Sequence, residues 1–497
     1  MAKGLQDGFT PEVVIVGGGL SGLSAAVHLV RRGVKPLVLE RDSILGGRAR
    51  SWNDPVTGDS VTVGPHIFLS EYPNMRAFLR LLGTEDRIVW QKNRFIDIVD
   101  GTRVTEIAMK PLPPPLHYLP AIVMNPRFFP ARDVRSNRKT ALLCMGLSED
   151  DVMTLDRTDA LSALRKLGVT EDYIKNFWAF TALSIMNVPL SECSAGSVFR
   201  FFKLMISHKS YDVGFGDSGL GDLFTEEARA AIEKGGGRVL TGAGVECITG
   251  EGSRATGVRL ADGTEIAAQE VLAALPPTAL ASIIPAGWRR RLRPFSSLHR
   301  FQPSPYISTY LWFDRKLTDR QFWARCYNEG DLNCDFYDYD NIYRKRSRPG
   351  SLITTNCIFC GRYSGLTDSE IVSRTVKELS EFLPEAATAK LVHSLVVRIP
   401  MAIHCPNPGV ESLRPGVSTG VLNLFVAGDW IQTHVPASME SACGSGAKAA
   451  EAILAGRGRK AEIFIPRSES QGISALVERL APRLRPLGLV PRPEDYI

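Results

Sequence analysis

The sequence predicts an α/β protein in which a parallel-sheet domain is interrupted by an inserted mixed α+β region and by a helical region. The first observation is a complete strand–helix–strand unit over residues 12–40. The second is a short apolar strand followed by an alanine-rich helix over residues 424–454. The third is residues 235–274, which alternate apolar and polar side chains as a strand and a hairpin do.

The N-terminal strand–helix–strand unit carries a glycine-rich turn, GGGLSG, between its first strand and its helix. Gly17 permits the tight turn, Gly19 lets the backbone approach a pyrophosphate, and Gly22 allows close packing of helix on strand. The free N–H groups and the dipole at the start of the helix favour anions. We expect a Rossmann-type domain whose turn binds phosphate through Gly17, Gly19, Leu20, Ser21 and Gly22.

Two further groups extend this predicted site. Glu40 ends the second strand, where a carboxylate accepts hydrogen bonds from the ribose hydroxyls of an adenosine. In the next segment, LGGRARSW, Gly46 and Gly47 offer a second close backbone approach, and Arg48 can neutralise a phosphate. A loop with a solvated arginine remains the alternative for this second segment.

The C-terminal motif LFVAGDW predicts a short apolar strand that ends at Gly428 and Asp429. A carboxylate there can bind a sugar-alcohol chain or hydroxyls near a diphosphate. The helix that follows is expected to start near Ser438 and Met439, and its small residues allow close contact with other backbone. A tightly packed alanine helix without a ligand is the competing interpretation.

Composition limits the other classes of function. The chain has 497 residues, a formal net charge of +6 and scattered basic residues, so we expect no nucleic-acid partner. Its nine cysteines show no framework spacing, which favours a reducing, cytoplasmic location. Cys357 and Cys360 form one CxxC without a second ligand pair, so we expect no metal. The apolar stretch over residues 13–30 contains the glycine turn and is not expected to span a membrane.

Several motifs together resemble the FAD-dependent amine oxidase and phytoene desaturase superfamily. The glycine turn and the GGR segment are followed by VGPHIFLSEYPNMRAFLRLLGTEDRIVWQ, which resembles plant-type carotenoid desaturases. YLWFDRKL is similar to a substrate-domain strand of these desaturases and of hydroxysqualene dehydroxylases. PNPGVESLRP and the closing LFVAGDW segment also resemble the family, so the similarity runs over residues 12–455.

The resemblance implies FAD as the cofactor and adds site residues. It implies that the isoalloxazine lies near Gly64, Pro65, His66 and Ile67. It further implies that the Val245 backbone pairs with adenine, although Gly244 stands where the family often has a basic residue. The helix from Ser438 would point its N-terminus at the flavin pyrimidine and stabilise reduced flavin.

The implied reaction is hydride transfer from an allylic C–H of a long apolar isoprenoid to the flavin, with quinone or dioxygen as the electron acceptor. The sequence does not identify catalytic residues, and His66 and Glu440 are considered only as electrostatic aids. Three alternatives stay open: a hydroxysqualene dehydroxylase or other polyprenyl redox enzyme, a flavin amine oxidase, and a non-catalytic prenyl-binding protein similar to Rab GDP-dissociation inhibitors. The acidic, aromatic and then basic stretch DFYDYDNIYRKR matches no plant desaturase segment.

Two segments suggest contact with a membrane surface. Residues 110–132 are apolar, broken by prolines and fringed by arginines, which suits an interfacial segment or a solvent-facing loop. Residues 473–485 predict a cationic amphipathic helix that docks on the protein or binds lipid. Aromatic residues over 161–206 suit an apolar tunnel or ordinary core.

We expect six consecutive segments along the chain. They are an FAD-binding part at 11–105, a helical substrate and membrane-contact region at 106–230, a second FAD-binding part at 231–285, a substrate-domain sheet and helix at 286–415, a C-terminal FAD-binding part at 416–456, and an amphipathic tail at 457–497.

Overall fold

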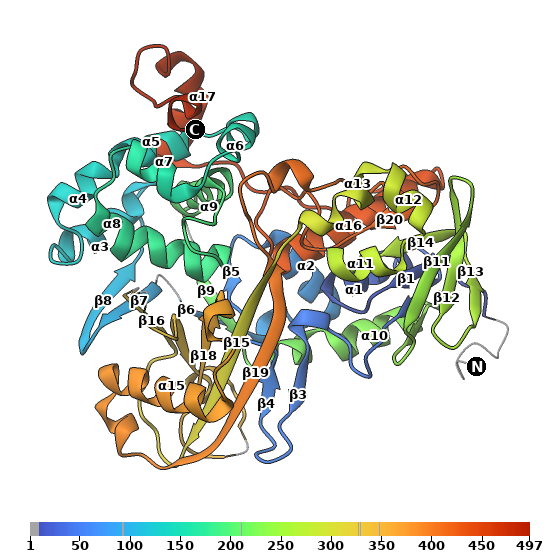
Figure 1. The fold of residues 1–497 in the computed structure, drawn as a ribbon, viewed down its shortest axis with the longest axis horizontal. Helices are drawn as coiled ribbons and strands as arrows, with labels where there is room; N and C mark the ends of the chain where they lie inside the picture. Colours follow the sequence, from blue (N-terminus) through green and yellow to red (C-terminus); the bar gives the residue numbers. More distant parts are fainter. Residues whose placement is uncertain (1–8, 92–93, 210, 327, 329, 347) are drawn as a thin grey trace.

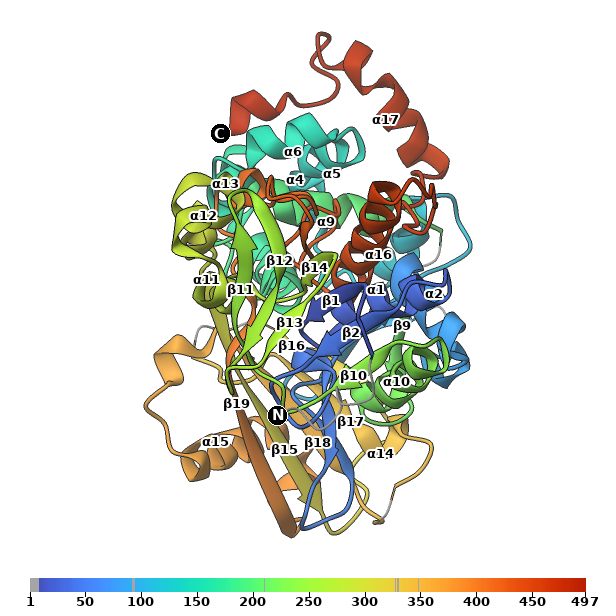
Figure 2. The same cartoon turned by 90° about the vertical axis from the view of Figure 1, so that its right-hand side faces the viewer.

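The computed structural model describes residues 9–91, 94–209, 211–326, 328, 330–346 and 348–497. A parallel-sheet region, a large, mostly antiparallel sheet and a helical region meet at the centre of the molecule (Figure 1). The C-terminal tail runs over the outer side of the helical region (Figures 1 and 2).

A five-stranded parallel sheet forms the first region and joins three distant stretches of the chain. Its order is β10-β2-β1-β14-β20, with parallel pairing between neighbouring strands. The strands are β1 (Val13–Val16), β2 (Pro36–Leu39), β10 (Arg238–Leu240), β14 (Glu270–Ala273) and β20 (Leu424–Val426). The predicted strand–helix–strand unit and the return of the chain near residue 424 are therefore confirmed.

Helices cover one face of this sheet and a small antiparallel sheet covers the other (Figure 2). The helices are α1 (Leu20–Val30), α10 (Thr225–Lys234) and α16 (Met439–Gly456), and the small sheet is β11 (Val245–Glu251), β12 (Arg254–Leu260) and β13 (Glu265–Ala267). A Cβ at Gly446 of α16 would lie 2.4 Å from the Ser21 carbonyl oxygen of α1. The small residues of α16 thus bring the two helix backbones into direct contact.

The second region is a seven-stranded sheet of order β19-β15-β18-β17-β16-β7-β8. Its strands are β7 (Arg94–Asp100), β8 (Arg103–Ala108), β15 (Pro303–Phe313), β16 (Phe322–Arg325), β17 (Asp335–Asp338), β18 (Leu352–Ile358) and β19 (Leu391–His404). Strand β7 and the first half of β8 lie in segment 11–105, which we predicted to be an FAD-binding part. The predicted boundary at residue 105 falls inside β8. Ile98 of β7 pairs in parallel with Ala324 of β16, a contact over more than 200 residues that local patterns do not encode.

The two faces of the seven-stranded sheet have different neighbours. One face, with Leu311, Trp323, Phe336 and Ile353, packs on α15 (Asp368–Phe382). The opposite face, which we call the inner face, carries the alternate residues of each strand. Its Tyr310, Phe322, Tyr337 and Leu352 belong to one apolar cluster with the helical region.

The helical region is built from short helices. They are α3 (Leu119–Met124), α4 (Ala131–Ser136), α5 (Arg138–Met145), α6 (Glu149–Leu155), α7 (Ala160–Lys166), α8 (Glu171–Tyr173) and α9 (Ala195–Ser207). Two π-helical segments, Ile174–Ala179 and Ala182–Met186, follow α8. Trp178 and Phe199 are fully buried, whereas Phe177 keeps accessible surface. Most of the aromatic residues are therefore core.

Shorter elements complete the fold. They are β3 (Ser51–Asn53), β4 (Ser60–Thr62), β5 (Phe68–Leu69), β6 (Ile88–Gln91), β9 (Val213–Gly216), α2 (Pro73–Leu82), α11 (Pro277–Ile283), α12 (Ala286–Arg291), α13 (Arg293–Ser296), α14 (Tyr339–Ile342) and α17 (Gly472–Leu484). Within the ranges given above, no helix combines the length and apolar character needed to cross a bilayer.

The predicted tail helix, α17, docks on the helical region. Lys203 of α9 pairs with Glu478 at 2.6 Å, and Arg485 pairs with Asp151 of α6 at 2.5 Å. The Ile473 backbone N–H donates to the Pro114 carbonyl at 2.9 Å. The tail and the proline-rich segment therefore lie side by side.

Candidate cofactor site

The glycine turn after β1 has the geometry that the sequence predicts. Gly17 has φ +110°, and a Cβ there would lie 2.5 Å from the Ala274 carbonyl oxygen. A Cβ at Gly22 would lie 2.0 Å from the Gly17 carbonyl oxygen, so both positions require glycine. Helix α1 starts at Leu20, and its N-cap, Gly19, supplies no side-chain hydrogen bond. The first-turn N–H groups, which include Leu20 and Ser21, thus keep donors for an anion.

The second glycine segment crosses directly over this turn. The Gly46 N–H donates to the Gly18 carbonyl oxygen at 2.8 Å. Gly47 has φ +57°, and a Cβ there would approach the Gly19 Cα to 3.3 Å. No described atom lies within 4 Å of the position that a Cβ on Gly19 would take. Both glycine segments therefore present bare backbone, as close binding of a diphosphate requires.

Arg48 joins the N-terminal part of the site to the C-terminal part. Its guanidinium forms two hydrogen bonds with the Asp429 carboxylate, at 2.9 and 2.8 Å, and one with the Ala402 carbonyl oxygen at 3.0 Å. Burial alone would raise the pKa of Asp429, but the Arg48 charge lowers it below the usual value. The Arg48 side chain is still 32% exposed, so it remains accessible to an anion.

Glu40 lies at the opposite end of the glycine turn. Its carboxylate accepts hydrogen bonds from the Gly18 N–H at 2.8 Å and the Asp42 N–H at 3.0 Å. The Ala243 N–H donates to the Glu40 carbonyl oxygen at 2.8 Å, which brings Val245 at the start of β11 close to this end. The structure thus gathers the residues predicted for adenosine.

The segment from Gly64 to Ile67 lies between the parallel sheet and the seven-stranded sheet. A Cβ at Gly64 would lie 2.8 Å from the Ser308 Oγ of β15. His66 Nδ1 lies 2.6 Å from the Gly64 carbonyl oxygen, and burial and the Arg48 charge lower the pKa of His66. Pro65 and Ile67 keep accessible surface beside it. This segment therefore faces both the glycine site and the inner face.

The N-terminus of α16 closes the far end of the site. The Ser438 hydroxyl caps the helix by accepting from the Ser441 N–H at 3.2 Å, and Met439 is the first helical residue. Glu440 has another role, because its carboxylate accepts from the Asn74 side chain at 2.6 Å and from the Met75 N–H at 2.9 Å. Burial raises the pKa of Glu440. Glu440 thus anchors the start of α2.

The donor set fits FAD. Bare glycine backbone and the start of α1 suit a diphosphate, Arg48 supplies a cation, and Glu40 supplies acceptors for a ribose. Gly428 has φ +143° and donates its N–H to Ser445 at 2.8 Å, which holds Asp429 in place. Among the described residues no group of three His, Cys, Asp or Glu side chains is arranged for a metal.

Four ring-bearing side chains of this part of the molecule are partly accessible and strongly desolvated. His66, Tyr72, Tyr118 and Tyr306 all keep accessible surface. Burial nevertheless lowers the pKa of His66 and raises the pKa of each of the three phenols. The partly accessible Ile67, Phe177, Leu395, Val397 and Val435 pack against the same apolar cluster.

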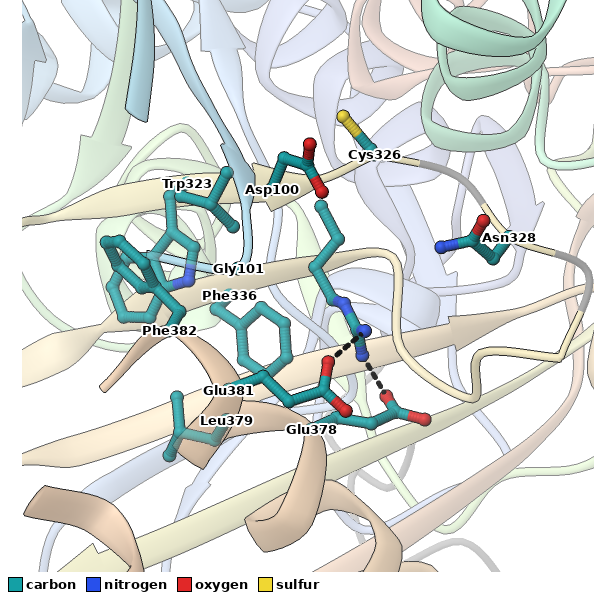
Figure 3. A pocket seen from close by; sticks show the side chains of 12 residues that line it. Asp100, Gly101, Trp323, Cys326, Asn328, Phe336, Glu378, Leu379, Glu381 and Phe382 are labelled. Atoms are coloured by element: carbon teal, nitrogen blue, oxygen red, sulfur yellow. Dashed lines mark hydrogen bonds and ion pairs between the residues drawn. The ribbon is translucent and has the colours of Figure 1, made fainter. Parts of the chain in front are cut away.

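A small pocket between the seven-stranded sheet and α15 is a different site (Figure 3). Its volume is about 100 Å³, and Trp323 and Phe336 line it. Glu378 and Glu381 in its wall both pair with Arg325, at 3.0 and 2.6 Å, so one guanidinium is shared by two carboxylates. Ligand pockets usually measure roughly 300–1,000 Å³. This pocket is too small for a dinucleotide or a long isoprenoid.

Sequence reasoning missed several residues near the site. The buried His404 interacts with Asp429, and burial lowers its pKa to about 4. Arg414 donates to the carbonyl oxygens of Asp429 and Ile431. Ser308 lies inside strand β15, and nothing in the sequence around it distinguishes it from an ordinary strand residue. Asp335 lies in the stretch DFYDYDNIYRKR, which matches no plant desaturase segment. That mismatch was the only sequence feature that pointed to this residue.

Comparison with known proteins agrees with this geometry. A family profile described as flavin containing amine oxidoreductase matches residues 20–454. The 15-cis-phytoene desaturase of Synechococcus elongatus is 28% identical over 459 residues, which cover 89% of this chain and 96% of the relative. The zeta-carotene desaturase of a Synechocystis species is 23% identical over 489 residues, covering 90% and 98%.

Solved structures share the fold. A putrescine oxidase bound to putrescine superposes with a TM-score of 0.69 at 16% identity, covering 90% of this chain and 99% of that one. At this identity the likeness concerns the fold alone. The predicted α/β fold class and the resemblance to the amine oxidase and phytoene desaturase superfamily are confirmed.

Proposed function

Because the chain belongs to the family of flavin-containing amine oxidoreductases, and is an FAD-dependent oxidoreductase of the desaturase type, we propose that it oxidises a long apolar isoprenoid. The supporting observation is the large apolar cluster shared by the helical region and the inner face, together with the close approach of Gly64 to Ser308 on that face. The relatives named for phytoene and zeta-carotene support the same substrate class. Because the chain belongs to a family of oxidoreductases, the alternative of a non-catalytic prenyl-binding protein is no longer needed.

We propose one role for each part of the cofactor site. The adenosine would lie between Glu40 and Val245, and the flavin ring would lie beside residues 64–67 and the start of α16. The full set of proposed FAD contacts is Gly17, Gly19, Leu20, Ser21, Gly22, Glu40, Gly46, Gly47, Arg48, Gly64, Pro65, His66, Ile67, Val245, Gly428, Asp429, Ser438 and Met439.

FAD, when bound, supplies the hydride acceptor for oxidation of an allylic C–H bond. The residues of this chain position the substrate and exclude water. The apolar cluster of the inner face and helical region removes hydrocarbon from water, which contributes roughly 25 cal/mol per Å². The buried His404, whose pKa is lowered to about 4, stays neutral near pH 7 and adds no charge beside Asp429.

The substrate assignment is tested by anaerobic incubation of the FAD-loaded protein with phytoene in liposomes. We expect the visible flavin absorption to bleach as the hydrocarbon is oxidised. Putrescine at the same concentration separates this proposal from an amine oxidase. Bleaching by putrescine and by none of phytoene, zeta-carotene or squalene-type lipids would overturn the isoprenoid assignment. A hydroxysqualene dehydroxylase or another polyprenyl redox enzyme remains the second candidate, and quinone and dioxygen remain the candidate electron acceptors.

We also propose that the tail and the proline-rich segment bind a membrane surface through which the substrate enters. Exposed apolar side chains gather on these two adjoining segments, with exposed fractions up to 75%. They are Leu112, Leu116, Leu119, Val123, Met124, Ile473, Leu476, Leu487 and Leu489. Arg479 and Arg483 lie on the same tail and complement anionic headgroups.

Co-sedimentation with anionic phosphatidylglycerol vesicles tests this surface. The double variant Leu487→Ser with Leu489→Ser removes two side chains that are 70% and 58% exposed. We expect at least fivefold weaker sedimentation than for the wild type. Val56→Ser is a matched control, because Val56 is 58% exposed on the β3–β4 loop far from the tail (Figure 1). Equal sedimentation of all three proteins would contradict the proposal.

A further inference from the structure

The part of the chain that joins β20 to α16 is held by one buried arginine. Residues 429–438, which we call the connecting segment, end at the N-cap of α16. The Arg414 guanidinium, whose side chain is 1% exposed, donates to three carbonyl oxygens of this segment. They belong to Asp429, Ile431 and Val435, at 3.3, 2.7 and 2.9 Å. Three backbone carbonyls of one segment therefore converge on a single cation.

Arg414 also reaches the first turn of α16. Its Nη2 lies 3.4 Å from the Ser441 Oγ, and the Ser441 hydroxyl donates in turn to the Asp429 carbonyl oxygen at 3.1 Å. The Thr433 Oγ1 lies 2.7 Å from the same hydroxyl. The Arg414 charge and the positive end of the α16 dipole thus lie at the same place, and both stabilise a negative charge in front of the helix.

A buried carboxylate holds Arg414 in this position. One oxygen of Glu411 lies 3.4 Å from the Arg414 Nη1, and the other pairs with Arg200 of α9 at 2.7 Å. The Ser197 hydroxyl, on the same helix as Arg200, donates to Glu411 at 2.9 Å. Burial alone would raise the pKa of Glu411, but the two arginine charges lower it to about 2. Glu411 is therefore a fixed negative charge behind Arg414 at pH 7.

The ionic contacts continue from Glu411 into the helical region. The buried Arg200 also pairs with Glu149 of α6 at 2.6 Å. The buried Asp156, at the end of α6, accepts from the Glu411 N–H at 3.0 Å. Along this chain of contacts Arg414 is the member next to α16, and the three carboxylates follow it toward α6 and α9. The positive end of the chain therefore lies on the side of the proposed flavin site.

A second buried arginine, Arg346, shows a more complete pairing. Its side chain is 5% exposed and pairs with Asp59 at 3.1 Å and with Asp340 at 2.7 Å. Two carboxylates thus compensate one charge. Within the described part of the chain, Arg414 pairs with Glu411 alone, and a further arginine shares that carboxylate. The Arg414 charge is therefore compensated only in part, and a buried cation of this kind favours an anion beside it.

We propose that Arg414, positioned by Glu411, fixes the connecting segment and stabilises reduced flavin through its charge. This inference rests on the proposed placement of the flavin at the start of α16, and it does not depend on which substrate is oxidised. Reduction adds negative charge to the flavin ring, and a buried cation nearby lowers the free energy of that state. The oxidised ring is neutral and gains little from the same cation. Arg414 is thus a positioning residue that makes the bound flavin a stronger oxidant.

The test measures the reduction potential of the flavin in the full-length, FAD-loaded protein, against a reference dye and without any isoprenoid. In Arg414→Gln we expect reduced FAD to lose about tenfold in affinity relative to oxidised FAD, which lowers the potential by about 30 mV. Glu411→Gln removes the negative charge behind Arg414, so the same affinity ratio should change by about threefold in the opposite direction. A role in packing alone predicts no such reversal of sign.

Arg414→Lys separates the charge from the hydrogen bonds, because lysine keeps the charge and lacks the planar fork of donors. Its flavin potential should stay near the wild-type value. In the protein without FAD, amide exchange of residues 429–438 should nevertheless become about tenfold faster in both Arg414 variants, because the three carbonyls lose their common donor. Unchanged exchange in both variants would contradict the positioning role.

Arg346→Gln is the matched control, because it removes a similarly buried arginine outside the proposed cofactor site. It should lower thermal stability and leave the flavin potential unchanged. Shifts of the same sign in Arg414→Gln and Glu411→Gln, or a shift in Arg414→Gln no larger than in the control, would overturn the inference. If one glutamine variant does not fold, the other decides by comparison with Arg414→Lys. If the protein takes up no FAD, the cofactor site and this inference fall together, whereas inertness toward phytoene removes the substrate proposal alone.

Discussion

At the scale of single residues, the ion pair between Arg48 and Asp429 holds the two ends of the chain together. Arg48→Gln leaves a buried carboxylate without its cation, so we expect a loss of about 2 kcal/mol in unfolding free energy at pH 7. We also expect at least tenfold weaker FAD binding. Thermal unfolding and FAD titration measure the two effects.

The pH dependence of this loss follows from the lowered pKa of Asp429. A carboxyl with a depressed folded pKa stabilises the protein above its unfolded pKa of about 3.9 and loses that contribution as the pH falls. The difference between wild type and Arg48→Gln should therefore shrink on acidification. Arg165→Gln, which breaks an exposed ion pair with Glu171, is the control and should change neither stability nor FAD affinity. A variant at Arg48 that behaves like this control would refute the role of the pair.

The contribution of Asp335 to stability depends on pH in the opposite direction from that of Asp429. Its folded pKa of about 7 lies above the unfolded value, so the folded state binds the proton more tightly. Stability from this group is full below about pH 4 and is lost as the pH rises through 7. Relative to wild type, Asp335→Asn should therefore gain thermal stability between pH 5 and pH 8, by an amount on the order of 2–4 kcal/mol. A constant difference between the two proteins over that range would contradict the assignment.

At the scale of elements, the contact between α1 and α16 fixes the start of α1 that faces the cofactor. Gly446→Ala places a Cβ 2.4 Å from the Ser21 carbonyl oxygen, so the two helices must separate. We expect a loss of about 2 kcal/mol or more and weaker FAD retention. Gly456→Ala at the end of the same helix meets no described atom within 4 Å and should be neutral or slightly stabilising. Unfolding midpoints and the flavin content of the purified variants provide the comparison.

The elements also show what the sequence could predict. The strand–helix–strand unit at the N-terminus and helix α16 follow from local patterns of glycine, apolar residues and a capping serine, which the structure reproduces at Gly17, Gly22 and Ser438. The pairing of β7 with β16 did not follow, because it depends on a contact between distant strands. Ser308 and Asn356 look like ordinary alternating residues, and only the register of β15 on β18 places them opposite each other.

At the scale of the whole molecule, three stretches of chain build one parallel sheet. The glycine turn after β1 and the motif after β20 meet at the carboxyl ends of its strands. Residues near Gly17 and residues near Asp429 stand more than 400 positions apart in the sequence but share one site through Arg48. The seven-stranded sheet then brings its inner face to residues 64–67. The proposed cofactor site and the inner face are therefore contiguous, as hydride transfer between a bound flavin and a substrate on that face would require.

The most direct test of this arrangement is amide hydrogen exchange with and without added FAD. We predict that FAD slows exchange in both residues 17–22 and residues 428–439, by at least tenfold in each, because one ligand contacts both segments. Protection of only one of the two segments, or of neither, would contradict the claim that the ends of the chain close around a single FAD.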